Sequence, residues 1–167
     1  MNIVRSDDFA QIPAEIGYTP TAQPAGLAAA ARRSNQVLVV EDAPVLARHL
    51  APVCEFLGAD IRAIPSDVDL GAALEDYRPM AVIAPFECTH LDGGHVLKAV
   101  ARHDASLPVM ILVGPNPAWL GAVDALVDLL GLEAARGVAG APAMGEIVQF
   151  LAQASQHARC RRASRRP

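Results

Sequence analysis

Between residues 36 and 155, short apolar segments alternate with segments whose apolar residues recur at helical spacing. Val37–Val40 is a continuous apolar run, typical of a strand that is buried on both faces of a sheet. Four further strands are expected at Ala59–Ile64, 80–84, Val109–Val113 and Gly137–Ala139, the last of them the weakest. This alternation predicts an α/β fold with a doubly wound parallel sheet, right-handed crossovers and helices on both faces.

Turn and capping residues mark the helices between these strands. Pro44 suits the first turn of a helix that Gly58 ends. Ser66 is interpreted as the N-cap of the next helix, with Asp69 three residues later as in a capping box. Three more helices are expected over about 94–103, 118–130 and 143–155, and Asp92 is expected to cap the first of these three.

The chain length of 167 residues and the hydrophobic fraction of 52% fit one globular domain over 36–155. Residues 1–34 are rich in proline and glycine and are expected to form a flexible N-terminal arm. Residues 156–167 carry five arginines and no acid, which leaves nine basic and eighteen acidic residues elsewhere. The charge pattern therefore predicts an acidic globule with a short arginine-rich C-terminal tail.

The sequence lacks the signatures of several protein classes. No stretch reaches the roughly 18 apolar residues of a membrane span, and no signal-peptide pattern opens the chain. Three widely spaced cysteines, Cys54, Cys88 and Cys160, favour a reducing cytoplasm over a disulfide framework. No glycine-rich phosphate loop follows a strand, and no serine lies on a nucleophile elbow. A cytoplasmic protein without a membrane partner or a specific nucleic-acid partner is expected.

Three motifs together carry a family resemblance. They are the run Val-Leu-Val-Val-Glu-Asp at 37–42, the turn Asp92-Gly93 after the third strand, and Ala141-Pro142 after the fifth. In this order the chain resembles the receiver domain of two-component response regulators, the CheY-like fold. The resemblance implies a flavodoxin-like strand order of 2-1-3-4-5 and a site at the carboxyl ends of the strands.

The positions that would carry receiver chemistry are degenerate. A receiver has its phosphoacceptor aspartate where Pro85 stands, a hydroxyl residue where Val113 stands and a lysine where Ala141 stands. The aromatic switch position on the fifth strand corresponds to Val138. Because proline has no carboxylate, the resemblance implies a pseudo-receiver that lacks aspartyl-phosphate chemistry and is not an enzyme.

Glu41 and Asp42 match the acidic pair with which receivers bind a divalent cation. Glu87 lies two residues beyond Pro85. Two interpretations of its side chain stay open: a substitute ligand for the cation, or a solvated acid in the loop. Without a third carboxylate, the pair is instead expected to lie at a helix N-terminus, where the dipole favours acids. Cys88, His90 and His95 match no closed zinc pattern, so no cofactor or metal is expected.

The favoured function is a phosphorylation-independent protein-interaction module in bacterial two-component signalling. In such domains the fourth helix, fifth strand and fifth helix contact a protein partner or a second copy, and Trp119 is an exposed candidate there. One alternative is an effector that binds a cyclic dinucleotide or other polyanion through the arginines Arg159, Arg161, Arg162, Arg165 and Arg166. Another is an atypical phosphorelay receiver that uses a different acid.

Overall fold

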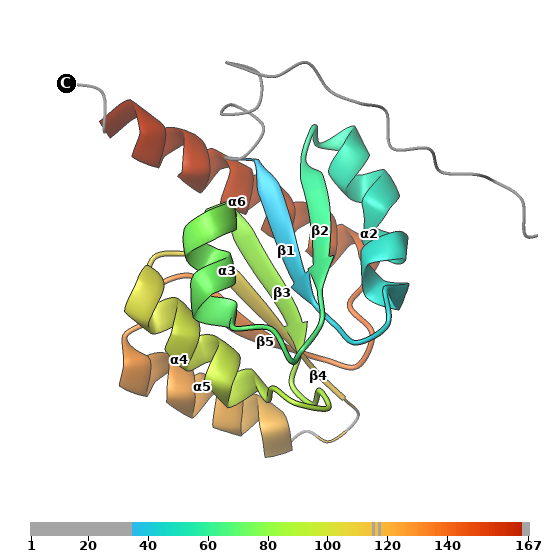
Figure 1. Ribbon diagram of the computed structural model, residues 1–167, viewed down its shortest axis with the longest axis vertical. Helices are drawn as coiled ribbons and strands as arrows, with labels where there is room; N and C mark the ends of the chain where they lie inside the picture. Colours follow the sequence, from blue (N-terminus) through green and yellow to red (C-terminus); the bar gives the residue numbers. More distant parts are fainter. Residues whose placement is uncertain (1–34, 115, 117, 165–167) are drawn as a thin grey trace, which may run out of the picture.

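The computed structural model describes residues 35–114, 116 and 118–164, so the arm expected over 1–34 lies outside the described residues. Five parallel strands form one sheet in the order β2-β1-β3-β4-β5 (Figure 1). The expected fold class and strand order are therefore confirmed. The strands are β1 (Gln36–Val40), β2 (Asp60–Ile64), β3 (Ala81–Pro85), β4 (Val109–Val113) and β5 (Ala135–Ala139).

Five helices in the described residues cover the two faces of the sheet (Figure 1). α2 and α6 pack on one face, whereas α3, α4 and α5 pack on the other. The helices are α2 (Val45–Phe56), α3 (Leu70–Tyr77), α4 (Gly93–His103), α5 (Ala118–Leu130) and α6 (Met144–Ser164). Each short strand is followed by a helix that crosses over the sheet to reach the next parallel strand. These helices cover both faces, as a parallel sheet requires.

Alternate residues of the central strands supply the two halves of the core. In β1, Leu38 and Val40 point toward α3, α4 and α5, whereas Val37 and Val39 point toward α2 and α6. All four side chains are fully buried, as the period of two along a strand requires in a doubly covered sheet. The continuous apolar run in the sequence therefore reflects burial on both faces.

The start of α3 differs from the sequence prediction. Asp69 is the N-cap, and its Oδ1 accepts hydrogen bonds from the backbone N–H groups of Gly71 and Ala72 at 2.9 and 3.3 Å. Ser66 is not the cap; its side chain is buried and points to a partner in another loop. The capping-box interpretation was wrong because an aspartate next to the helix caps it directly.

The end of α6 also differs from the prediction. The helix was expected to end near residue 155, but it continues to Ser164, so the described part of the arginine-rich segment is helical. At 1.5 Å per residue, its 21 residues span about 31 Å, and its last turns extend beyond the amino edge of the sheet (Figure 1). Arginine is a good helix former, and cations near a helix C-terminus are favoured by the dipole. No helix of the described residues is long and apolar enough to cross a membrane.

Candidate functional site

The acids that follow β1 lie at the carboxyl edge of the sheet, where the loops after β1, β2 and β3 meet. Glu41 is nearly buried, with 9% of its surface exposed. Its Oε2 accepts a hydrogen bond from Leu46 N at 2.7 Å, and its Oε1 accepts one from Ala47 N at 2.8 Å. Because Pro44, the N-cap of α2, makes no side-chain cap bond, Glu41 satisfies these helix donors instead. The expected place of an acid at this helix N-terminus is confirmed for Glu41.

Asp42 joins three loops through its two carboxylate oxygens. Oδ1 accepts hydrogen bonds from Ser66 N at 3.1 Å and from Ser66 Oγ, in the loop after β2. Oδ2 accepts from Thr89 N at 3.2 Å and from Thr89 Oγ1 at 2.5 Å, in the loop after β3. Ser66 Oγ in turn accepts a hydrogen bond from His90 N at 3.2 Å. We call Asp42, Ser66 and Thr89 the Asp42 latch.

The Asp42 latch favours the charged carboxylate. Hydrogen bonds donated first by the Ser66 side chain and then by the Thr89 side chain hold the pKa of Asp42 far below its ordinary value of 3.8. The carboxylate therefore stays ionised through the whole physiological range. Hydrogen bonds from Ser66 and Thr89 stabilise this charge.

The residues present do not fit the divalent cation site that the receiver resemblance implies. Each oxygen of Glu41 and Asp42 already accepts a hydrogen bond from the protein, and a hard cation needs several oxygen ligands. Glu87 is exposed, and within residues 35–164 that are described, no three histidine, cysteine or acidic residues are grouped to hold a metal ion. Glu41 and Asp42 thus serve as hydrogen-bond acceptors between structural elements.

The four degenerate positions offer no side-chain oxygen or nitrogen at this edge. Pro85 is the half-buried last residue of β3 and pairs with Leu112 of β4. Val113 is completely buried, and Val138 is half-buried against the core under α2 and α6. Ala141 is exposed. None of these side chains is able to attack, donate to or neutralise a phosphoryl group.

An aromatic pair lies beside this edge, and sequence reasoning missed it. Phe86, the residue after Pro85, stacks on Trp119 with ring centroids 4.7 Å apart and planes 30° apart. Trp119 is half-buried, so its expected exposure was wrong. Gly93 leaves room for the Phe86 ring, since a Cβ at Gly93 would lie 2.6 Å from Phe86 Cδ2. The signal in the sequence was the aromatic residue directly after Pro85 together with the glycine of Asp92-Gly93.

The remaining candidates of the loop after β3 do not gather around one point. Asp92 caps α4, as expected, by accepting a hydrogen bond from His95 N at 2.8 Å. That bond lowers the pKa of Asp92, and its carboxylate also pairs with His95 Nδ1 at 2.9 Å. Burial, and then the charges of Asp42 and Glu41, raise the pKa of the Cys88 thiol. A thiol with a raised pKa is a poor nucleophile and a poor metal ligand.

Arg159 and Arg161, in the described part of the C-terminal segment, lie at the other end of the molecule. Arg159 is exposed on α6, whereas Arg161 forms an ion pair with Asp104, the residue after α4. Ala158, on the same stretch, is buried with 6% of its surface exposed. Arg165, Arg166 and the side chain of Arg162 lie outside the described part of the chain. The segment 156–164 therefore contributes to packing, and Arg161 is engaged within the fold.

No family model and no curated protein sequence matches the chain. Solved structures do match, and receiver domains recur among them. A signal receiver domain from Vibrio parahaemolyticus aligns with a TM-score of 0.64 and 20% identity over 80% of this chain and 98% of its own. A response regulator receiver domain protein from Clostridium thermocellum aligns with a TM-score of 0.60 and 16% identity, over 75% of this chain and 97% of its own. The receiver domain of nitrogen regulatory protein C aligns with a TM-score of 0.59 and 21% identity, over 75% of this chain and 97% of its own.

These similarities establish the class of fold. The chain has the CheY-like fold of response regulator receiver domains, and the shared region covers nearly the whole of each of those domains.

Proposed function

We propose that this chain is a phosphorylation-independent receiver-like module, which acts in bacterial two-component signalling by binding a protein partner. Two observations together carry the proposal. Pro85 stands at the end of β3, and both carboxylate oxygens of Asp42 accept hydrogen bonds from the protein. Phosphoryl transfer depends on a positioned nucleophile and on charge stabilisation. This edge of the sheet offers neither.

The Asp42 latch supports a single fixed arrangement of the loops. Thr89 lies in the loop between β3 and α4, and it is held to Asp42 through both its backbone N–H and its hydroxyl. The stacked Phe86 and Trp119 join the same loop to the start of α5. A switch needs two arrangements of comparable free energy. These contacts favour one of them, and we infer that the partner surface is presented permanently.

The surface formed by α5, β5 and the first turn of α6 is the best candidate for partner binding. α5 buries only Val123, and it exposes Leu129 by 80%. At the start of α6, Met144 is 54% exposed. Asp124 and Asp128 are exposed on α5, which has no basic residue. The exposed Leu129 beside the acids of the same helix suits a partner with an apolar patch and a basic rim.

Incubation with acetyl phosphate and Mg²⁺, followed by intact mass measurement, tests phosphorylation independence. We expect no added mass, because no carboxylate lies at the β3 end. A receiver domain with its aspartate intact, run in parallel, shows that the reagent is active. A hydroxylamine-labile adduct mapped to Glu87, Glu41 or Asp42 would instead support the atypical phosphorelay alternative.

A matched pair of variants tests the partner surface. Leu129→Glu places a charge on α5, and Phe56→Glu places the same charge at another exposed apolar side chain, 83% exposed, on α2. We expect Leu129→Glu to abolish pull-down of a partner from the native host, or self-association in light scattering, and Phe56→Glu to retain it. Equal loss or equal retention in the two variants would refute this surface.

A further inference from the structure

β5 is an edge strand with one unpaired side. It pairs with β4 in parallel and in unbroken register, and no strand of the described residues lies on its other side. At its two ends, Ala134 O accepts a hydrogen bond from Val109 N at 3.1 Å, and Gly140 N donates one to Val113 O at 2.9 Å. Neighbouring residues of a parallel strand direct their backbone N–H and C=O groups to opposite sides. The groups that point away from β4 are therefore those of Ala135, Gly137 and Ala139.

This outer side of β5 is open within the described part of the chain. Edge strands are commonly blocked by proline, lysine, a bulge or a covering segment. β5 reads Ala-Arg-Gly-Val-Ala, has no bulge in its register with β4, and is at least partly exposed at every residue. Its one long side chain, Arg136, is engaged with α6: it donates a hydrogen bond to Glu146 O at 3.2 Å, and its Cζ lies 5.1 Å from the centroid of the Phe150 ring.

β2, the edge strand at the other side of the sheet, is better protected. It presents two exposed charged side chains, Asp60 and Arg62, and Pro65 follows its last residue. Asp60 N and Ile64 O bond toward β1, so the alternation places the N–H of Ala63 on the outer side. Charges and proline at an edge discourage pairing with another strand. Of the two edge strands, β5 is thus the one suited to strand addition.

The surroundings of β5 are acidic. Residues 118–150 hold four acids and one base, and the base is the engaged Arg136. All four acids are exposed; they are Asp124, Asp128, Glu133 and Glu146. A segment that carries lysine or arginine complements this charge, whereas an acidic segment is repelled.

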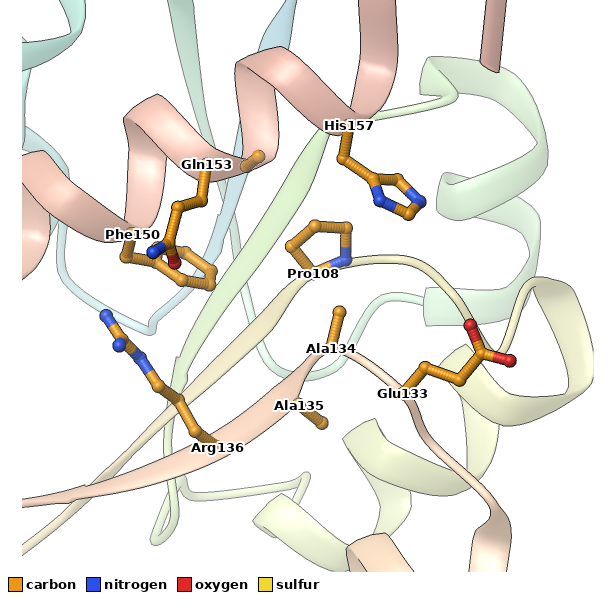
Figure 2. Close-up of a pocket in the computed structure, with 9 residues that line it drawn as sticks. Pro108, Glu133, Ala134, Ala135, Arg136, Phe150, Gln153 and His157 are labelled. Carbon is orange, nitrogen blue, oxygen red and sulfur yellow. The ribbon is translucent and has the colours of Figure 1, made fainter. Parts of the chain in front are cut away.

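A groove of about 340 Å³ lies between β5 and α6, beside the amino half of β5 (Figure 2). Its apolar lining includes the buried residues Pro108, Phe150 and Ala154. Every second side chain of an added strand points to this face of the sheet. Apolar side chains at those positions would lie next to the groove, so an added strand that alternates apolar and basic residues fits both features.

We propose that β5 receives an extended basic segment of a partner protein as a sixth strand, with its apolar side chains toward the groove between β5 and α6. The proposal rests on the protein-interaction function proposed above and specifies the form in which the partner is bound. In this mode of recognition, main-chain hydrogen bonds supply affinity, and pockets for alternate side chains supply specificity.

Titration of the full chain with a blocked hexapeptide of alternating lysine and valine, followed by amide NMR and hydrogen exchange, tests the proposal. We expect saturable shifts and slowed exchange at the outward amides of Ala135, Gly137 and Ala139. A matched hexapeptide of alternating glutamate and valine keeps the length and the apolar residues, and should bind at least roughly ten-fold more weakly because its charge is repelled. Equal binding of the two peptides, or unchanged exchange at the three amides, would overturn the proposal.

Exchange in the free chain tests the other possible occupants of this strand edge. Slow exchange at the same three amides before any peptide is added would show that the chain itself or a second copy already pairs with β5. That result would also overturn the proposal.

A matched pair of proline variants separates strand addition from general charge attraction. Ala139 on β5 and Ala63 on β2 are both exposed, and both direct the backbone N–H outward, so proline at either position removes no hydrogen bond between strands. We expect Ala139→Pro to weaken binding of the lysine peptide roughly ten-fold, through the lost main-chain hydrogen bond and the added ring, and Ala63→Pro to leave binding unchanged. Equal effects of the two variants would overturn the proposal.

The exchange measurement on the unmodified chain remains decisive if a proline variant fails to fold. Failure of the lysine peptide to bind, while Leu129→Glu still abolishes partner capture, would refute strand addition and leave the proposed function standing.

Discussion

Asp42 keeps the residue type that receivers use to bind a cation, yet protein donors occupy both of its oxygens. Ser66 and Thr89, which donate to it, lie 24 and 47 residues further along the chain. The same carboxylate thus holds loops together at a position where the receiver resemblance implies a cation site. The consequence is a pH dependence that can be measured.

We expect the stabilising effect of Asp42 to disappear in acid. Its folded pKa lies below the unfolded value of 3.8, so the charged carboxylate contributes its full stability above that pH. The contribution is lost as the pH falls below about 4 toward the folded pKa. The difference in melting temperature between wild type and Asp42→Asn should therefore be largest at pH 7 and shrink toward pH 2.5. A difference that stays constant over this range would contradict the latch.

A pair of glycine substitutions tests the packing around Phe86. Gly93→Ala places a Cβ 2.6 Å from Phe86 Cδ2, and we expect it to lower the free energy of unfolding by about 1–3 kcal/mol. Gly121→Ala on α5 meets no atom within 4 Å and should raise stability by about 0.5–1 kcal/mol. Urea unfolding of both variants measures these effects. If Gly93→Ala left the free energy of unfolding unchanged, it would show that the Phe86 ring moves aside easily.

At the scale of elements, α6 covers one face of the sheet and also extends beyond it. Its first half contributes Phe150 and Leu151 to the core on that face. Its second half buries Ala158 and pairs Arg161 with Asp104. The segment expected to be a separate arginine-rich tail is thus a part of the folded domain in residues 156–164.

Shortening the chain after Ser155 should therefore destabilise the fold. The truncation removes the buried Ala158 and a partly exposed ion pair, which by itself contributes up to about 1 kcal/mol. Shortening after Ser164 removes two arginines but leaves both contacts, and serves as the control. We expect a lower urea midpoint in the first variant alone. The same midpoint in both would mean that the end of α6 is only loosely attached.

At the scale of the whole molecule, the chain has the CheY-like fold, and several positions at one edge lack the groups that the receiver resemblance implies there. Pro85, Val113 and Ala141 lie at the ends of three strands or just beyond them, and each lacks the group that the receiver pattern places there. A substitution at one of these positions would leave the groups at the other two absent.

Pro85→Asp alone should consequently fail to restore phosphorylation by acetyl phosphate. The added carboxylate would face Val113 and Ala141, which supply no hydroxyl and no cation, and transfer relies on such groups. Intact mass after incubation with Mg²⁺ is the measurement, and the triple variant Pro85→Asp, Val113→Thr, Ala141→Lys is the informative comparison. Prompt labelling of the single variant would show that these neighbouring positions matter little.

The sequence by itself determined the order and type of the elements and the residues missing from the receiver pattern. Strand burial and helix periodicity are local properties, so Val37–Val40 and the helix over 118–130 were predictable without knowledge of the fold. Tertiary structure alone decided which groups meet: Asp42 with Thr89, Phe86 with Trp119, and Arg161 with Asp104 across 57 residues. The physical reason is that a hydrogen bond or ring contact depends on position in space. Periodicity along a chain does not fix that position until the sheet has brought the loops together.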